Sequence, residues 1–377
     1  MMAITLKTYG GGGGKVFLKN GLIYKKSYAL TKENNKKLLW YHSINPDIRL
    51  RKQYEWLKRI RNYNDLSIHF AEIVSSKVGN NWFEYSMRNI QGKTITNQML
   101  HNDNFRRVKN TIYNAALFAR NSLHTKNIRR NLNKNYFVKN HMQKLNSRIN
   151  ALIEIYPTFR PFFENDYITI NGKRLKNLPL IFKEIINDSV LLEKLQPEST
   201  CLVHGDLHLG NIFIKTNNND FILLDPRGIN TDPMYDISKL SHNTLGLYDF
   251  CLLRMFSLKV NSATNEVEVI FNVSDHTRSI YRKVHQFLID LYKDIWLKSN
   301  PNKQKFLLQY ISNNASHCIG AAPFQILESQ FKKSDLDFIA IYSVGIYLFN
   351  RLLLIKNRQV GFEEAVSLEN MSFIFNI

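Results

Sequence analysis

The sequence predicts an α+β protein, with a small β-rich N-terminal part and a larger, mainly helical remainder. Short apolar runs separated by turn signals fill the first hundred residues, and two of them flank Asn20-Gly21, the strongest short hairpin signal. After Gln91-Gly92 the apolar residues recur at helical spacing, and this spacing dominates again from Thr277 onward. We therefore expect two domains, at residues 1–90 and 91–377.

The N-terminal part is expected to combine several strands with one helix. In that helix, Tyr54, Leu57 and Ile60 recur along one face. Five consecutive glycines, Gly10–Gly14, separate the first two strands. The strands are predicted at Ile4–Tyr9, Lys15–Lys19, Leu22–Ser27, Ile68–Ser76 and Trp82–Met87, and the helix at Pro46–Arg61.

Helices dominate the remainder, with short β segments between them. Pro197 closes the third of these helices, because proline does not continue a helix. Thr216–Asp220 is rich in turn formers and separates two apolar runs. We predict helices at Phe105–Leu123, Tyr136–Tyr156, Leu178–Leu195 and from Thr277 onward, hairpins at Tyr167–Leu175 and Met255–Phe271, and strands at Ile212–Ile214 and Phe221–Leu224.

The chain carries a formal net charge of +20, from 51 Lys and Arg against 31 Asp and Glu. A field of this sign favours anionic partners such as nucleotide phosphates, nucleic acid, an acidic glycan or a membrane surface. A solvated basic surface explains the same charge, and composition does not decide between the two. Apolar residues make up 44% of the chain, which supports a large packed core and argues against global disorder.

Cys201, Cys251 and Cys318 are far apart and show no CxxC spacing, so they predict core thiols in a reducing compartment. The N-terminus lacks the apolar core of a secretory signal. The most apolar segment, Phe338–Ile355, contains Arg351, which favours a buried helix over a membrane span. We expect a cytoplasmic protein without a transmembrane segment, for which peripheral membrane association stays open.

Residues 203–228, VHGDLHLGNIFIKTNNNDFILLDPRG, carry the clearest chemical signal, because polar residues stand at the outer ends of two apolar runs. Asp206, Asn211 and Asp225 offer hard oxygen atoms, the ligands that suit Mg²⁺ beside phosphate. If the two runs pair as a hairpin, Asn211 and Asp225 lie close together. Asp206 then faces the same cleft, where it can accept a proton from a substrate hydroxyl.

The stretch HGDLHLGN, from His204 to Asn211, resembles the HGDLHxxN catalytic loop of the protein kinase-like phosphotransferases, in the branch with aminoglycoside phosphotransferases and choline kinases. The resemblance implies a bilobal protein kinase-like fold. It implies that Asp206 is the catalytic base or an orienting carboxylate, and that Asn211 and Asp225 hold Mg²⁺. It further implies that His204 and Asp236 brace the loop.

The same resemblance implies a nucleotide site in the N-terminal lobe. A glycine-rich turn that covers the phosphates matches Gly11, Gly12 and Gly13, for which a flexible linker is the alternative. The family's strand lysine, which contacts the phosphates, matches Lys25 or Lys26. Strand alternation turns only one of them inward and does not decide which, although we favour Lys25.

In this family the lysine pairs with a helix glutamate, matched here by Glu55, and a solvated surface glutamate is the alternative. The family's hinge, whose backbone pairs with the adenine edge, matches FEYSMRNIQGKTI, so Met87 and Asn89 are expected to line the base. The resemblance covers about the first 245 residues in order. The C-terminal third, where this family usually holds its acceptor specificity, shows no motif.

Two positions near the loop have more than one interpretation. The segment after the second apolar run reads Asp-Pro-Arg-Gly, where protein kinases have Asp-Phe-Gly. Arg227 either clamps an anionic acceptor or braces the loop through a salt bridge to Asp232 or Asp236, and we favour the brace. His208 either packs within the loop or contacts the acceptor, with packing preferred.

We therefore predict an enzyme that transfers the γ-phosphoryl group of ATP or GTP, with Mg²⁺, to a hydroxyl of a small molecule or sugar. Asp236 follows Asp225 by only eleven residues, which leaves no room for the activation loop of a protein kinase. The segments LDPRG and PMYDISKL are similar to those of phosphotransferases in bacterial capsule or surface-glycan synthesis. The net charge suits an anionic acceptor. The alternatives are an antibiotic kinase and a nucleotide-binding pseudokinase. Nucleic acid is not expected as a partner, since no known motif accompanies the basic helices.

Overall fold

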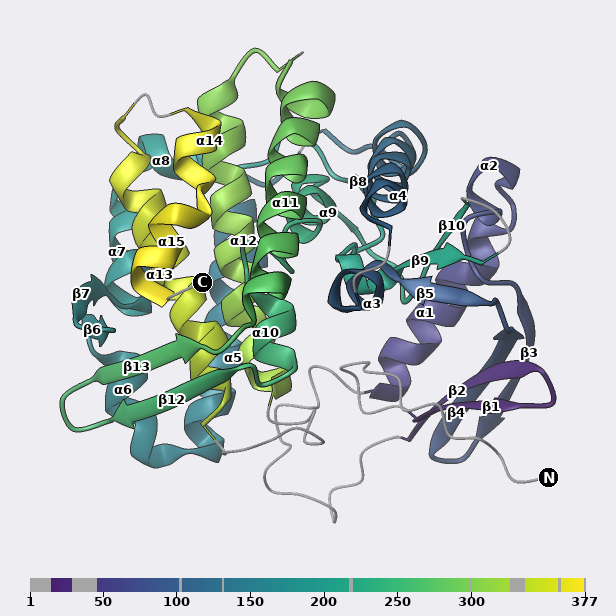
Figure 1. Ribbon diagram of the computed structural model, residues 1–377, viewed down its shortest axis with the longest axis horizontal. Helices are drawn as coiled ribbons and strands as arrows, with labels where there is room; N and C mark the ends of the chain where they lie inside the picture. The colour runs from purple at the N-terminus through teal and green to yellow at the C-terminus, as the bar shows by residue number, and fades with distance from the viewer. Residues whose placement is uncertain are drawn as a thin grey trace. The chain divides into compact units, whose positions relative to one another are not determined.

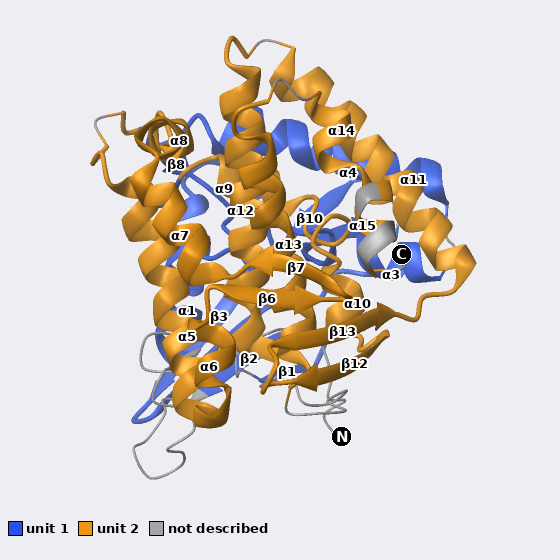
Figure 2. Cartoon of the chain, turned by 90° about the vertical axis from the view of Figure 1, so that its left-hand side faces the viewer, with its two compact units in different colours: residues 1–128, 201–231 blue, residues 129–200, 232–377 orange. Residues whose placement is uncertain are grey.

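The computed structural model describes residues 15–28, 46–101, 104–130, 132–216, 220–298, 300–325, 336–358 and 361–375. The chain divides into two compact units, shown in Figure 2: unit 1 comprises residues 1–128 and 201–231, and unit 2 comprises residues 129–200 and 232–377. Mixed sheets and helices confirm the predicted α+β class, with a β-rich N-terminal region and a larger helical C-terminal part. The division places the motif segment 201–231 in the same unit as the N-terminal strands.

The first sheet of unit 1 is antiparallel and follows the order β1-β2-β4-β3 (Figure 1). The predicted hairpin around Asn20-Gly21 is confirmed, because β1 and β2 pair on either side of this turn. The strands are β1 (Lys15–Lys19), β2 (Leu22–Tyr28), β3 (Ile73–Gly79) and β4 (Trp82–Arg88).

The strand predicted at Ile68–Ser76 begins later in the structure than expected. A short helix, α2 (Asn64–Ser67), stands just before it, and β3 starts only at Ile73. The intervening Phe70 is buried and forms an isolated β-bridge with Leu223. Phe70 therefore pairs with Leu223 instead of extending β3, and Ile68 stays exposed.

Helix α1 (Pro46–Ile60) confirms the helix predicted here. It packs against β2, β3 and β4, and Trp56, Leu57 and Ile60 are its buried apolar residues. Their spacing of three and four residues places them on one face of the helix. Tyr54, which was expected on that face, is only half-buried.

A second sheet of unit 1 follows the order β10-β9-β5, with β5 (Gly92–Thr94), β9 (Ile212–Lys215) and β10 (Phe221–Leu223). The antiparallel pairing of β9 with β10 confirms the predicted hairpin of the motif segment. Strand β5 was not predicted. It approaches β9 so closely that a Cβ atom on Gly92 would lie 2.0 Å from the Ile214 carbonyl oxygen, and only glycine permits this contact.

The rest of unit 1 consists of one short strand pair and several helices. Phe105–Leu123 is helical as predicted, with its last five residues in a π turn. These elements are β8 (Cys201–Leu202), β11 (Asn230–Thr231), α3 (Ile95–Leu100), α4 (Phe105–Phe118), the π turn η2 (Ala119–Leu123) and the 3₁₀ turn η5 (Leu209–Asn211).

Unit 2 is mainly helical. Tyr136–Tyr156 is helical as predicted, whereas Leu178–Leu195 forms two helices, because the Asp188 side chain caps the second one by accepting from Leu191 N. The α-helices are α5 (Gln143–Ile155), α6 (Arg160–Glu164), α7 (Leu178–Asn187), α8 (Ser189–Leu195), α9 (Met234–Lys239), α10 (Tyr248–Leu252), α11 (Asp275–Tyr292), α12 (Lys303–Gln325), α13 (Phe338–Ile355), α14 (Phe362–Val366) and α15 (Leu368–Phe375). Short turns are η3 (Val138–Met142), η4 (Pro157–Phe159) and η6 (Lys293–Leu297).

Unit 2 also contains a four-stranded sheet in the order β12-β13-β6-β7. Both predicted hairpins of this unit are confirmed by the antiparallel pairs β6–β7 and β12–β13. A parallel contact between β13 and β6 joins them, although some ninety residues separate the two strands in sequence. The strands are β6 (Tyr167–Ile170), β7 (Lys173–Lys176), β12 (Phe256–Asn261) and β13 (Glu266–Phe271).

Helix α13 is long and apolar enough to cross a membrane, with a mean hydropathy of 1.8, but 83% of that window is buried inside the protein. It packs against α12, as expected for a core helix. The three cysteines are buried free thiols, also as expected. The strand predicted at Ile4–Tyr9 and the glycine run Gly10–Gly14 lie outside the residues that the structure describes.

Candidate functional site

Strand β2 carries two lysines whose side chains lie in different environments. Lys25 forms an ion pair with Asp225, and its Nζ lies 3.5 Å from Oε1 of Gln53. Lys26 Nζ lies 4.0 Å from the centroid of the Trp82 ring. Because successive strand residues face opposite sides, only Lys25 turns toward the motif segment. Burial lowers the pKa of Lys25 to about 7, whereas the Asp225 carboxylate in contact with it favours the charged ammonium form.

Backbone hydrogen bonds shape the loop that begins at His204. This histidine is fully buried, and its Nδ1 accepts a hydrogen bond of 3.2 Å from the Asp206 N–H. Its carbonyl oxygen accepts from the Arg227 N–H at 2.7 Å. The His208 Nδ1 accepts from the Gly210 N–H at 3.1 Å, a contact within the loop. The two histidines thus hold the loop on both sides of Asp206.

Asn211 and Asp225 lie at the end of the β9–β10 hairpin, at the point where a metal ion was predicted. The Leu224 N–H donates to the Asn211 carbonyl oxygen at 2.8 Å, which ties the two strand ends together. The Asn211 Nδ2 donates to the Asp206 carbonyl oxygen at 2.9 Å, so the Asn211 Oδ1 is the amide oxygen left for a ligand. Asp225 has a φ of 56°, a left-handed conformation that Asp tolerates better than most residues.

These two oxygen donors fit Mg²⁺, which binds through one or two protein groups plus phosphate oxygens and water. No group of three or more His, Cys, Asp or Glu side chains that could hold a metal ion occurs among the described residues. A cation at Asn211 and Asp225 would therefore need further oxygen ligands from a bound phosphate or from water.

Arg227 pairs with the predicted base. Its Nη2 donates to Asp206 Oδ2 at 2.6 Å, and the two side chains are 28% and 13% exposed. The ion pair with Asp206 is local to the loop, to which the backbone N–H of Arg227 is also bound through the His204 carbonyl oxygen. The expected salt bridge to Asp232 or Asp236 would join the two units and stays a prediction.

Helix α1 presents Gln53, not Glu55, to Lys25. Glu55 is exposed, whereas the amide of Gln53 contacts both Lys25 and Tyr85. The structure does not bring Glu55 to the strand lysine. Helical spacing was the signal that could have found Gln53, since it precedes the buried Trp56 by three residues and so lies on the same face.

The remaining predicted residues are distributed as follows. Met87 is buried at the end of β4, where it pairs with Ile23 of β2, and Asn89 is half-buried just beyond. Asp236 is fully buried in α9 of unit 2, whereas the loop belongs to unit 1, and its role in bracing the loop stays a prediction. The three glycines expected over the phosphates, Gly11, Gly12 and Gly13, lie outside the described part of the chain.

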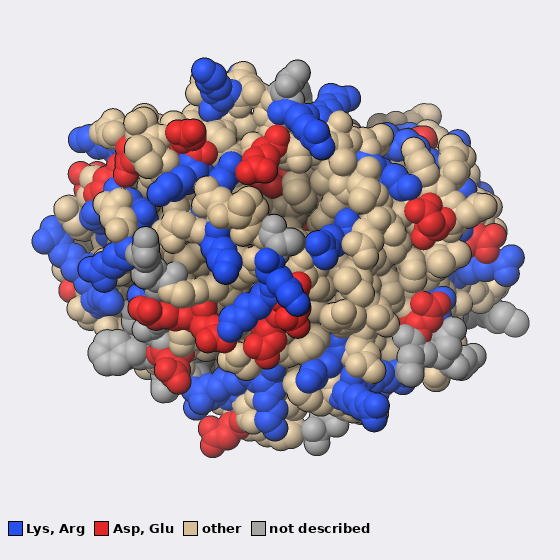
Figure 3. Space-filling model, turned by 90° about the horizontal axis from the view of Figure 1, so that it is seen from above, with Lys and Arg blue, Asp and Glu red and all other residues tan. Residues whose placement is uncertain are grey.

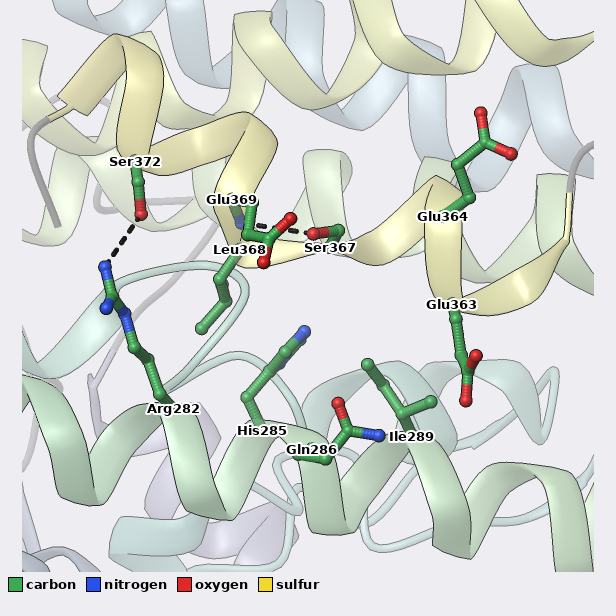
Figure 4. Close-up of a pocket in the computed structure, with 10 residues that line it drawn as sticks. All are labelled: Arg282, His285, Gln286, Ile289, Glu363, Glu364, Ser367, Leu368, Glu369 and Ser372. Atoms are coloured by element: carbon green, nitrogen blue, oxygen red, sulfur yellow. Dashed lines mark hydrogen bonds between the residues drawn. The ribbon is translucent and has the colours of Figure 1, made fainter.

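A cavity of about 520 Å³ lies in unit 2 between α11 and the α14–α15 pair (Figure 4). Its glutamates are exposed, and none of the predicted site residues lines it. His285 on its wall is buried and contacts the Val366 carbonyl oxygen through Nε2 at 2.9 Å, so this side chain is engaged within unit 2. The lining residues are Arg282, His285, Gln286, Ile289, Glu363, Glu364, Ser367, Leu368, Glu369 and Ser372.

The surplus of basic residues does not form one continuous patch on the face shown in Figure 3, where Lys and Arg side chains are interspersed with Asp and Glu. The solvated-surface explanation of the net charge therefore fits this face. A localised cation, such as the Lys25 ammonium, is a more specific feature than the total charge.

No family model matches the sequence, and no curated protein matches it. Among solved structures, the chain is similar to an aminoglycoside-3'-phosphotransferase of type VIII, with 11% identity and a TM-score of 0.41 over 84% of this chain and 93% of that chain. It is also similar to choline kinase from Cryptosporidium parvum Iowa II, with 12% identity and a TM-score of 0.41 over 98% of this chain and 93% of that one. Neither similarity is close enough to assign a fold or an activity.

Proposed function

We propose that this chain is a nucleotide- and Mg²⁺-dependent phosphotransferase with a small-molecule hydroxyl as its acceptor. One observation carries the proposal: in unit 1, a buried lysine contacts one predicted metal ligand, and the other metal ligand binds the backbone of a carboxylate that an arginine holds. Lys25 meets Asp225, and Asn211 binds the backbone of Asp206. Phosphoryl transfer needs this set, because its catalysis is mainly positioning and charge stabilisation.

In this proposal each residue has one task. The Lys25 ammonium binds phosphate oxygens of the donor nucleotide, and Asp206 accepts the proton of the acceptor hydroxyl. The acceptor oxygen forms its bond to the γ-phosphorus as the bond to the leaving phosphate oxygen breaks. Asn211 and Asp225 would hold Mg²⁺, which when bound neutralises charge on the phosphates. Met87 and Asn89 would line the base, and the glycine run would cover the phosphates.

For the acceptor we propose an anionic sugar, of the kind used in surface-glycan synthesis. The supporting observations are the net charge of +20 and the similarity of LDPRG and PMYDISKL to phosphotransferases of surface-glycan synthesis. Release of ADP or GDP with sugar phosphates, but not with aminoglycosides, would support this acceptor. Release with aminoglycosides alone would replace it with the antibiotic-kinase alternative.

The first test is thermal unfolding with ATP, with GTP and with neither, each with and without Mg²⁺. We expect the melting temperature to rise only with nucleotide and Mg²⁺ together, because a ligand that binds the folded state stabilises it. The nucleotide that produces the shift is the donor. No shift at millimolar nucleotide would contradict the proposal and favour a non-catalytic role.

Replacing Asp206 or Asp225 with alanine distinguishes ligand binding from phosphoryl transfer. Asp206→Ala should keep the nucleotide-dependent rise in melting temperature but lose turnover by about 10²- to 10⁴-fold, since it removes the base. Asp225→Ala should lose both turnover and the Mg²⁺-dependent part of the rise. Asp275→Ala, at a side chain that is 99% exposed, serves as the control. Near-normal turnover in both site variants would rule out the mechanism.

A further inference from the structure

Gln53 connects three elements of unit 1 through one side-chain amide. Its Oε1 accepts a hydrogen bond of 2.6 Å from the Tyr85 hydroxyl on β4 and lies 3.5 Å from Lys25 Nζ on β2. Its Nε2 donates to the Pro226 carbonyl oxygen at 3.3 Å. The residue after Asp225 is therefore held to the helix that also contacts Lys25.

The segment after Asp225 lies tightly against the same helix. Gly228 has a φ of 68°, and a Cβ atom there would lie 2.9 Å from the Lys52 carbonyl oxygen and 3.0 Å from Trp56 Cβ. A larger residue would have to push the segment away from α1. The contact of Gln53 with Pro226 is thus part of a close fit between helix and segment.

Gln53 is uncharged, and this property decides how Lys25 is paired. An amide can accept a hydrogen bond from an ammonium group but cannot neutralise its charge. In the described part of the chain, the carboxylate that the structure shows against Lys25 is that of Asp225, whose side chain is 39% exposed. Lys25 and the predicted metal ligand Asp225 are therefore paired with each other, and a metal ion at Asp225 would compete with the ammonium group.

We propose that Gln53 is the positioning residue of Lys25, and that its neutrality keeps Lys25 on Asp225 until nucleotide and metal ion enter together. The inference rests on the function proposed above. A divalent cation alone has to displace the ammonium group from Asp225. A nucleotide offers that ammonium group a phosphate instead and frees the carboxylate for the cation. Each ligand then raises the affinity for the other, as reciprocal coupling requires.

The test measures binding of Mn²⁺, used as a paramagnetic substitute for Mg²⁺, with and without a non-hydrolysable ATP analogue. In the wild-type chain we expect weak Mn²⁺ binding alone and binding at least about tenfold tighter with the analogue. Gln53→Glu places a carboxylate beside Lys25 and should tighten Mn²⁺ binding without nucleotide by about tenfold, so that the analogue adds less.

Three further variants make the result specific. Gln53→Ala removes the hydrogen bonds without adding charge and should not tighten nucleotide-free Mn²⁺ binding. Gln143→Glu adds the same charge at an exposed position of α5 in unit 2 and should behave as wild type. Lys25→Met removes the competing ammonium group, so it should bind Mn²⁺ more tightly alone, and the analogue should add less than it does in the wild type.

The outcomes separate this inference from the proposed function. Nucleotide-free Mn²⁺ binding by both Gln53→Glu and Lys25→Met that matches wild type would overturn the inference and leave the proposed function intact. Absence of any Mn²⁺ binding by the wild type with the analogue present would overturn the proposed function and the inference together.

Discussion

An ion pair between Arg227 and Asp206 lies within the loop, and the sequence did not predict it. The sequence indicated a bracing arginine with Asp232 or Asp236 as its partner, and did not point to Asp206. In the structure the guanidinium holds one carboxylate oxygen of the predicted base, Oδ2, at 2.6 Å. In the proposed mechanism this contact fixes the orientation of the Asp206 carboxylate. Arg227 is therefore a positioning residue for Asp206 in the proposed mechanism.

Replacing Arg227 tests this role. Arg227→Met should lower turnover by about tenfold to a hundredfold, because small displacements of a catalytic group have effects of this size. The nucleotide- and Mg²⁺-dependent rise in melting temperature should stay unchanged. Arg227→Lys should recover part of the turnover, and added guanidinium should partly rescue Arg227→Met. Loss of nucleotide binding in Arg227→Met would contradict the assignment.

Some site residues could be predicted from the sequence and others could not. The motif spacing pointed to Asp206, Asn211 and Asp225, because loop and hairpin are local in sequence. Lys25 and Lys26 were indistinguishable, since alternation gives two faces without saying which one is covered. Gln53 was missed because the family pattern directed attention to a glutamate.

Two hairpins of the same type show how an element depends on its surroundings. Asn20 and Asn171 both begin an Asn-Gly turn and both have a left-handed φ, of 50° and 49°. Asn20 is exposed. Asn171 instead exchanges two hydrogen bonds of 2.7 Å with the Val269 N–H and carbonyl groups of β13. Its side chain thereby fastens the β6–β7 hairpin to a strand distant in sequence.

We expect Asn171→Ala to lower the free energy of unfolding by about 2–4 kcal/mol, because it leaves two backbone groups of Val269 without their partner. Asn20→Ala should have a smaller effect, about 1 kcal/mol, since only the turn preference is lost. Chemical denaturation followed by circular dichroism measures both. Equal losses in the two variants would show that the link to β13 contributes nothing.

For the whole molecule, buried histidines of unit 2 link stability to pH. Burial lowers the pKa of His141 to about 3 and of His285 to about 4, and brings the pKa of His317 well below its usual value. As pH falls from about 6.5 toward 4, the unfolded chain takes up protons that the folded chain excludes, so these groups reduce stability. Burial raises the pKa of Asp232 to about 7, which favours the folded state in the same interval, but it is one group against three.

We predict that stability falls on acidification from pH 6.5 to pH 4 and that His285→Gln reduces the slope. A single histidine contributes at most about 1.4 kcal/mol per pH unit. His276→Gln, at an exposed position of the same helix, is the control and should keep the wild-type slope. Denaturation curves at several pH values give the slopes, and identical slopes for His285→Gln and wild type would exclude the role of His285.

The sequence by itself determined the α+β class, the four hairpins predicted from it and the order of the chemical motif in residues 203–228. These features depend on turn residues, alternation and helical spacing, which act over a few neighbouring residues. Only the tertiary structure decided that β5 pairs with β9, that β13 pairs with β6, and that Gln53 and Arg227 hold the charged groups of the site. Contacts between distant segments depend on which faces are buried together, and no local pattern specifies that choice.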